Sequence, residues 1–199
     1  MPSYANNILF TADLHFGHRG VIEFCNRPWK DVERMDNGLI SLWNATVKDS
    51  DHVYVLGDFS FHNAQETHKI AACLKGHKIL VLGNHDKHSR SQYIRMGFAD
   101  VVDRVTLTLL GKRLQLSHFP YWPEHPELEP KHELRYPHLR PVKSWGKEIL
   151  LCGHVHMLWK TLGRQINVGC DQWKYRPVLL SQIEHQIALI EKESCNALS

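Results

Sequence analysis

The chain has 199 residues, 43% of them hydrophobic, and a formal net charge of +3. This length and composition predict one compact domain over residues 1–199. The scattered lysines and arginines argue weakly against a dedicated duplex-binding protein. No apolar stretch approaches the roughly 18 residues of a membrane span, and five cysteines without a CxxC pair are typical of reduced thiols. We therefore expect a soluble, cytoplasmic protein.

Strands and helices are predicted to alternate in the first half of the chain. Apolar residues between positions 32 and 47 recur at helical spacing, which predicts a crossover helix between two parallel strands. A second helix is predicted after Asn63, whose spacing from Glu66 is typical of a capping box, and Gly76 is placed to end it. The predicted buried strands are residues 8–12, 53–56 and 79–82, which completes a βαβαβ pattern.

The second half of the chain is predicted to supply another sheet and another helix. Gly111-Lys112 is typical of a tight hairpin turn. Residues 119–143 show no periodicity, and a loop of that length is usually functional or disordered. Asn167 and Trp173 are expected to hold a loop against the last strand. The predicted strands are residues 104–110, 113–117, 148–152 and 164–168, and the predicted terminal helix opens at Ser181.

Five short polar clusters follow or end apolar runs. In open α/β sheets, side chains just beyond the carboxyl ends of the strands converge on a shared crevice, so the clusters are expected to meet. Each cluster alone is more typical of an ordinary turn, whereas the ordered set favours a metal site. The clusters are Asp13-Leu14-His15, Gly57-Asp58, Gly83-Asn84-His85-Asp86, Ser117-His118 and Gly153-His154-Val155-His156.

The residue types in these clusters favour a site for divalent metal ions. Asp13 and His15 stand two residues apart, so an extended backbone would point both side chains the same way, and His154 and His156 repeat that spacing. Carboxylate, amide and imidazole groups without thiolate suit Mn²⁺, Fe, Zn²⁺ or Mg²⁺. The number of imidazoles favours the transition metals over Mg²⁺ and Ca²⁺.

The ordered clusters resemble the calcineurin-like metallophosphoesterase superfamily. Its pattern is Asp-x-His, Gly-Asp, Gly-Asn-His-Asp or Glu, a lone His and Gly-His-x-His, and all five blocks occur in order between residues 13 and 156. The first block continues as His15-Phe16-Gly17-His18, which resembles a small, single-domain bacterial or phage branch. Arg27-Pro28-Trp29 is similar to the same branch.

The resemblance implies a four-layer α/β/β/α sandwich with two central mixed β-sheets. It implies two divalent ions, with Mn²⁺ the first choice, bridged by Asp58. It also implies that His85 donates a proton to the leaving group or polarises a phosphoryl oxygen, with Asp86 orienting its imidazole, and that His18 and Arg27 reach the substrate phosphate. The implied ligands are Asp13, His15, Asp58 and His156 for one ion, and Asp58, Asn84, His118 and His154 for the other.

The function that follows is hydrolysis of a phosphodiester or phosphomonoester by hydroxide that the two ions activate. Tyr121, Trp122 and Tyr136 in the long loop favour a nucleotide-like or nucleic-acid-end substrate, although a self-packed lid with these residues as its own small core explains them slightly better. Two alternatives stay open: a nuclease or end-processing phosphatase that acts on nucleic acid, and a binding module without catalysis. No obligate protein partner is indicated by the sequence.

Overall fold

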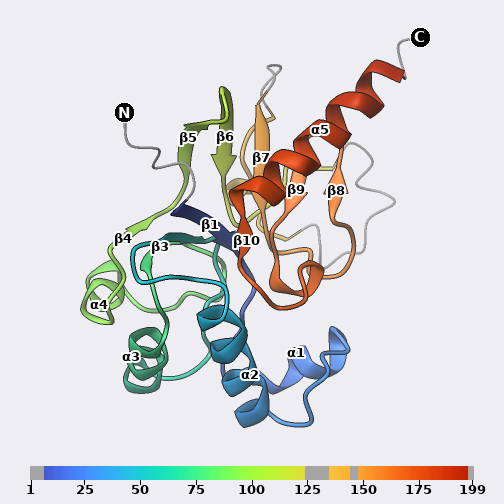
Figure 1. Ribbon diagram of the computed structural model, residues 1–199. Coiled ribbons are helices and arrows are strands. Elements are labelled where there is room, and N and C mark those ends of the chain that lie inside the picture. Colours follow the sequence, from blue (N-terminus) through green and yellow to red (C-terminus); the bar gives the residue numbers. More distant parts are fainter. Residues whose placement is uncertain (1–6, 124–134, 144–147, 197–199) are drawn as a thin grey trace.

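The computed structural model describes residues 7–123, 135–143 and 148–196. Two five-stranded sheets lie at its centre, with helices flanking them (Figure 1). Both sheets are mixed, as expected from the sequence. Part of the predicted loop, residues 124–134, lies outside the described residues.

The first sheet is parallel except at one edge. Its strands β1 to β4 pair in parallel. Strand β10, which immediately precedes α5, pairs antiparallel with β1. The predicted crossover pattern of the first half is therefore confirmed. In spatial order the strands are β10 (Val178–Leu179), β1 (Ile8–Thr11), β2 (His52–Val55), β3 (His77–Val81) and β4 (Asp100–Val102).

The second sheet has a parallel centre and antiparallel edges. Strand β6 pairs in parallel with β7 and β7 with β9, whereas β5 and β8 are antiparallel to their neighbours. The ends of β6 and β7 therefore point the same way and deliver their following loops to one place. In spatial order the strands are β5 (Val105–Leu109), β6 (Lys112–Leu116), β7 (Ile149–Cys152), β9 (Gln165–Asn167) and β8 (Thr161–Leu162).

Four helices accompany the first sheet and a fifth follows β10. Asp31 caps the second helix by accepting a hydrogen bond from the backbone N–H of Arg34, and the apolar face of that helix packs into the core. None of the helices in the described ranges combines the length and apolar character needed to cross a bilayer. The helices are α1 (Arg19–Phe24), α2 (Val32–Asn44), α3 (Ala64–Cys73), α4 (Arg90–Arg95) and α5 (Leu180–Asn196).

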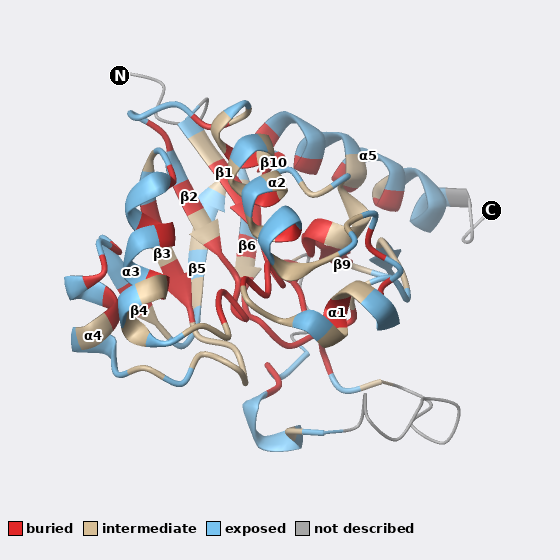
Figure 2. Ribbon diagram, turned by 90° about the horizontal axis from the view of Figure 1, so that it is seen from below, coloured by how far each residue is buried: buried red, intermediate tan, exposed pale blue. Residues whose placement is uncertain are grey.

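Two apolar clusters form most of the core, and Figure 2 shows the buried residues concentrated along the strands and inner helix faces. The first cluster joins α1 to α4 with one face of the first sheet, and Trp43 of α2 is its largest fully buried side chain. The second joins the other face of that sheet to the second sheet and to α5, which contributes Ile183, Ile187 and Ile190. The α/β sandwich expected from the sequence is thus confirmed.

Most of the predicted strand boundaries differ from the structure by one or two residues, and two further differences concern a turn and the start of a helix. The hairpin turn is Leu110-Gly111 rather than Gly111-Lys112, because Leu109 pairs with Lys112 and both turn residues have positive φ, 55° and 66°, as a type I′ turn requires. The terminal helix begins at Leu180, one residue before the predicted start, and the side chain of Gln182 accepts a hydrogen bond from the backbone N–H of Leu179.

Candidate metal centre

The predicted site residues meet where loops from both sheets converge. Asp13 and His15 follow β1, Asp58 follows β2, and Asn84 and His85 follow β3. His118 follows β6, and His154 and His156 follow β7. Isolated bridges tie these loops together, because Ala12 pairs with Gly169 and Phe16 pairs with Ser60. The convergence expected from parallel strands therefore extends across both sheets.

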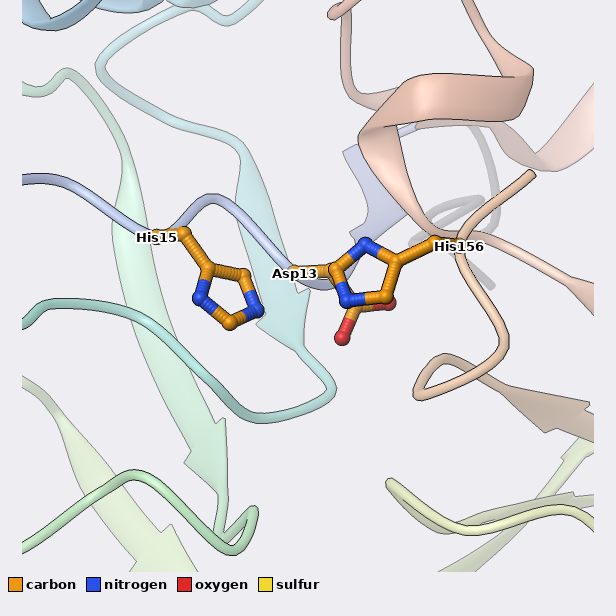
Figure 3. A group of neighbouring side chains, drawn as sticks. All are labelled: Asp13, His15 and His156. Atoms are coloured by element: carbon orange, nitrogen blue, oxygen red, sulfur yellow. The ribbon is translucent and has the colours of Figure 1, made fainter. Parts of the chain in front are cut away.

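One group of possible ligands consists of Asp13, His15 and His156. One donor atom from each lies within 4.8 Å of the others, and the two imidazole rings are 5.0 Å apart between centroids. Figure 3 shows the three side chains lying together, with Asp13 and His15 on the loop after β1 and His156 on the opposite segment. Two residues near the start of the chain thus meet one that lies more than 140 positions later.

A second group gathers around His118. Its Nε2 lies 3.0 Å from Oδ1 of Asn84 and 3.2 Å from Nδ1 of His154. Its Nδ1 lies 2.8 Å from the carbonyl oxygen of Leu56, which accepts only, so Nδ1 is assigned the proton and Nε2 is left with a lone pair. The lone pairs of His118 Nε2 and Asn84 Oδ1 face one another, which is unfavourable unless a cation lies between them, and this arrangement therefore suits a metal ion.

Asp58 lies between the two groups. Its Oδ2 is 3.5 Å from Nε2 of His15 and 3.6 Å from Nε2 of His118. The backbone N–H of His85 donates to the other carboxylate oxygen at 2.9 Å, which fixes the orientation of the carboxylate. A single carboxylate oxygen is thus within reach of both ligand groups.

The backbone of the ligand residues differs from the expectation of an extended chain. Asp13 and His15 have φ values of 55° and 54°, and His154 and His156 have 72° and 45°, all in the left-handed region. The side chains therefore do not share a direction through strand geometry, as the two-residue spacing predicted. They converge because each residue occupies a left-handed turn conformation, which typically costs about 1–3 kcal/mol for a residue other than glycine and often clusters at functional sites.

Unpartnered buried nitrogens test whether these residues fit a metal. Within the described residues, both ring nitrogens of His15 and Nε2 of His154 are buried without a hydrogen-bond partner. An unpaired buried polar atom of this kind is destabilising by about 1–3 kcal/mol. A divalent cation accepts lone pairs from imidazole nitrogen, amide oxygen and carboxylate oxygen, so the donor set fits the ions that the sequence implied.

The shifted pKa values of the metal-free site also indicate that these residues suit a metal ion. Burial raises the pKa of Asp58 to about 8, with a further contribution from the negative charge of Asp86, and burial raises the pKa of Asp13 to about 6. Burial lowers the pKa of His154 to about 2, and neighbouring groups, including the positive charge of Arg140, add to that shift. A divalent cation would stabilise the ionised form of the buried carboxylates and would accept the lone pairs of neutral imidazoles. Its binding would therefore offset the cost of burying both kinds of group.

His85 lies beside these groups, but the carboxylate of Asp86 is bound to backbone N–H groups and not to the His85 imidazole. The ring of His85 is 5.7 Å from that of His15 and 4.7 Å from that of Phe61. Burial lowers the pKa of His85 to about 4. The prediction that Asp86 orients this imidazole is wrong in its partner: the Asp86 carboxylate accepts hydrogen bonds from the backbone N–H groups of Asp58, Phe59 and Gly83 at 2.8–3.0 Å.

Arg27 is buried behind the ligands and does not face a substrate. Its Nε donates to Asp171 Oδ1 at 2.8 Å, and its two Nη atoms donate to the carbonyl oxygens of Asp13 and Leu14. The side chain has no exposed surface. The expectation that Arg27 reaches the substrate phosphate is therefore wrong, because its donors are used by the protein.

Asp171 is a site residue whose role the sequence did not indicate. Its Oδ2 lies 3.0 Å from Nδ1 of His156, so it contacts one of the possible ligands directly. Asn167 supports the same loop: its side-chain amide donates to the backbone carbonyl oxygens of His156 and Trp159, and its backbone carbonyl oxygen accepts from Nε1 of Trp173. The expectation that Asn167 and Trp173 hold a loop is thereby confirmed. The contacts of Asp171 and of Asn167 join segments that are separate in the sequence, so they depend on the tertiary structure.

Aromatic rings stand on two sides of the ligands. On one side His18 stacks on Phe61 with ring centroids 4.0 Å apart, and Phe24, which is 56% exposed, meets the ring of His156 at 5.3 Å. On the other side Phe119 lies 4.9 Å from the ring of His154. Of the predicted substrate contacts, His18 is thus close to the possible ligands, 5.3 Å from the ring of His15.

Comparison with protein families identifies the domain. A family model described as the calcineurin-like phosphoesterase superfamily domain matches residues 7–171. The chain belongs to this superfamily. Membership supports a metal-dependent phosphoesterase in general, and the clustered carboxylates and imidazoles of Asp13, His15, Asp58 and His118 agree with a metal-binding member of the superfamily.

Proteins similar in sequence to this chain occur in Methanocaldococcus jannaschii and in two mycobacterium phages. The uncharacterized protein MJ1445 of Methanocaldococcus jannaschii is 29% identical over 93% of this chain and 92% of its own length. The Gene 66 proteins of mycobacterium phages D29 and L5 are 33% and 32% identical over 84% of this chain and 89% and 88% of their own lengths.

A solved structure is also similar. The crystal structure of AQ665, a protein of unknown function from Aquifex aeolicus, has a TM-score of 0.65 and 26% identity, and the match covers 90% of this chain and 98% of that one. The two chains therefore share a fold over nearly their whole lengths.

Proposed function

We propose that the protein is a dinuclear metal-dependent phosphoesterase that hydrolyses a small phosphodiester or phosphomonoester. The observation that carries this proposal is the place of Asp58, whose Oδ2 is 3.5 Å from His15 and 3.6 Å from His118. Position 1 would be held by Asp13, His15, Asp58 and His156, and position 2 by Asp58, Asn84, His118 and His154. Mn²⁺ is the proposed ion at both positions, with Fe, Zn²⁺ and Mg²⁺ as alternatives.

Bound divalent ions of this kind stabilise phosphoryl oxygens and lower the pKa of water from about 15.7 toward about 7. The protein's own residues then have three tasks. Asp58 fixes the separation of the two ligand groups, because its second oxygen is held by the backbone N–H of His85. Asn84 contributes a neutral ligand, which limits the negative charge that a phosphate ester meets. His85 is proposed to donate a proton to the leaving oxygen.

We propose a nucleotide-like substrate, because aromatic rings flank the ligand groups on both sides. The exposed ring of Phe24 on one side and Tyr136, 6.4 Å from the ring of His154 on the other, are placed to contact an aromatic group joined to a bound phosphate. A nucleotide or the end of a nucleic acid carries such a group. A cytoplasmic location and action without an obligate protein partner complete the proposal.

One assay panel tests the proposal. Protein loaded with Mn²⁺, Zn²⁺ or Mg²⁺ is given an aryl phosphomonoester, an aryl phosphodiester, cyclic nucleotides and short oligonucleotides, and Asp58→Asn is assayed beside the wild type. The wild type is expected to bind two Mn²⁺ per chain and to hydrolyse at least one small ester, and Asp58→Asn to lose both properties. Activity confined to oligonucleotides, with a steep fall in added salt, would favour a nuclease instead. Metal binding without hydrolysis of any ester would favour a binding module.

A further inference from the structure

Arg27 and Asp171 form a buried ion pair behind the ligands of position 1. Arg27 Nε donates to Asp171 Oδ1 at 2.8 Å, and Arg27 Nη2 donates to Asp171 Oδ2 at 3.1 Å. Both side chains have 0% exposed surface. Two parallel hydrogen bonds between a guanidinium and a carboxylate fix the relative orientation of both planes, which a single bond does not.

This ion pair contacts position 1 from two sides. Arg27 Nη2 donates to the backbone carbonyl oxygen of Asp13 at 2.7 Å, and Nη1 donates to that of Leu14 at 2.8 Å. Asp171 Oδ2 lies 3.0 Å from Nδ1 of His156. A continuous chain of hydrogen bonds therefore runs from the backbone of one position 1 ligand to the side chain of another, across 143 residues of sequence.

Each end of this series of hydrogen bonds has a defined physical effect. A carboxylate only accepts hydrogen bonds, so Asp171 places the proton of His156 on Nδ1 and leaves the lone pair on Nε2 to face an ion. At the other end, Asp13 has a φ of 55°, and the bond from Arg27 to its carbonyl oxygen holds the segment in that unfavourable conformation.

Asp171 is poorly suited to bind a cation itself. Cys25, His156 and Asp171 also lie close enough together to resemble a metal site. Both oxygens of Asp171 already accept hydrogen bonds from the guanidinium of Arg27, however, and a further cation at this point would meet that positive charge. The geometry instead suits a supporting role for the pair.

We propose that Arg27 and Asp171 are positioning residues that hold Asp13 and His156 in place and set the tautomer of His156, and that position 1 owes much of its affinity for a divalent cation to them. The proposal rests on the two-metal function proposed above. Its specific consequence is asymmetry: loss of the pair weakens position 1 and leaves position 2, which lacks these contacts, nearly unchanged.

The experiment counts Mn²⁺ bound to metal-free full-length protein by titration, with free Mn²⁺ measured by electron paramagnetic resonance. Asp171→Asn is expected to weaken one of two sites by about 10- to 100-fold and to leave the other near its wild-type affinity. Arg27→Lys keeps the charge but lacks the planar fork, so a smaller loss is expected at the same site. Asp36→Asn is the matched control, because Asp36 lies 2.7 Å from His62, which is outside the ligand set.

The outcomes separate the two proposals. A wild type that binds fewer than two Mn²⁺ overturns the two-metal function and the positioning role together. A wild type that binds two, with Asp171→Asn unchanged or with both sites weakened equally, overturns the positioning role alone.

A second measurement uses only the wild type, in case a variant fails to fold. Histidine ¹⁵N spectra of the Zn²⁺-loaded protein are expected to show His156 protonated at Nδ1 and coordinated through Nε2. Coordination through Nδ1 would overturn the proposal.

Discussion

The carboxylate of Asp86 accepts a hydrogen bond from the backbone N–H of Asp58 at 2.9 Å. Asp86 therefore helps to fix the conformation of the loop that carries Asp58, the residue that lies between the two ligand groups. The sequence pattern placed Asp86 beside His85 and predicted a contact between their side chains. In the folded chain the carboxylate instead joins the loops after β2 and β3, because it also accepts from Gly83.

Removing this carboxylate is expected to affect stability as well as metal binding. Asp86→Ala leaves the backbone N–H groups of Asp58, Phe59 and Gly83 without their acceptor and should lower the free energy of unfolding by about 3 kcal/mol. Asp86→Asn keeps one acceptor oxygen and should lose less. Urea unfolding of the metal-free protein measures both changes. An Asp86→Ala variant as stable as the wild type would show that these hydrogen bonds contribute little.

Replacement of His85 is expected to separate catalysis from metal binding. His85→Gln should reduce kcat by about 10²- to 10⁴-fold for esters with poor leaving groups, because such groups need a proton. The loss should be smaller for an aryl ester, whose phenolate leaves without one. The Mn²⁺ content should stay at the wild-type value. Equal loss of activity on both ester classes, or loss of metal, would contradict the proposed role.

Gly153 allows a steric test of the site. A Cβ at this position would lie 2.6 Å from Oδ2 of Asp13 and 2.5 Å from Cβ of Ala12, so Gly153→Ala should displace the Asp13 carboxylate and abolish binding of one metal ion. Gly163→Ala is the control. Its Cβ would meet nothing within 4 Å, and its positive φ of 54° costs only about 1–2 kcal/mol of stability. Metal content by elemental analysis distinguishes the two variants.

The effect of Mn²⁺ on stability is expected to grow with pH. Burial and the charge of Asp86 raise the pKa of Asp58 from 3.8 to about 8, so in metal-free protein this group retains a proton that the unfolded chain has already lost. Its contribution to stability is present at pH 4 and is lost as the pH rises toward 8. Mn²⁺ replaces that proton and reverses the loss.

Thermal unfolding with EDTA or Mn²⁺ checks this prediction. The increase in Tm on adding Mn²⁺ should be larger at pH 8 than at pH 6. Asp58→Asn is expected to lose metal binding, so Mn²⁺ should change its Tm little at either pH, and without Mn²⁺ its Tm should fall less between pH 6 and pH 8 than that of the wild type. An increase in Tm that is larger at pH 6 would contradict the argument.

The sheets and the identity of the possible ligands were predictable because short-range patterns encode them. Apolar runs give the strands, and the polar residues that follow them in a fixed order give the family resemblance. The short elements were missed: β10 contains only two residues, and α4 has six. The capping box of Ser89 and Gln92 that begins α4 was readable in the sequence and was overlooked.

The supporting contacts of the site were not predictable, because they join residues that no local pattern relates. Arg27 and Asp171 are 144 positions apart, and nothing near either residue indicates the other. An arginine beside a motif suggested a phosphate contact, whereas tertiary packing turned its guanidinium toward two carbonyl oxygens. The left-handed conformation of Asp13 and His15 was hidden for the same reason, since two-residue spacing alone suggests a straight strand.

Asp13 and His15 precede His154 and His156 by 141 residues each, so the ribosome makes the first pair well before the second. A ribosome-bound intermediate that ends before β7 therefore has an incomplete set of donors at both positions. If the proposed two-metal function holds, tight binding of metal has to wait until the second sheet is built, so binding of the ion would report completion of folding.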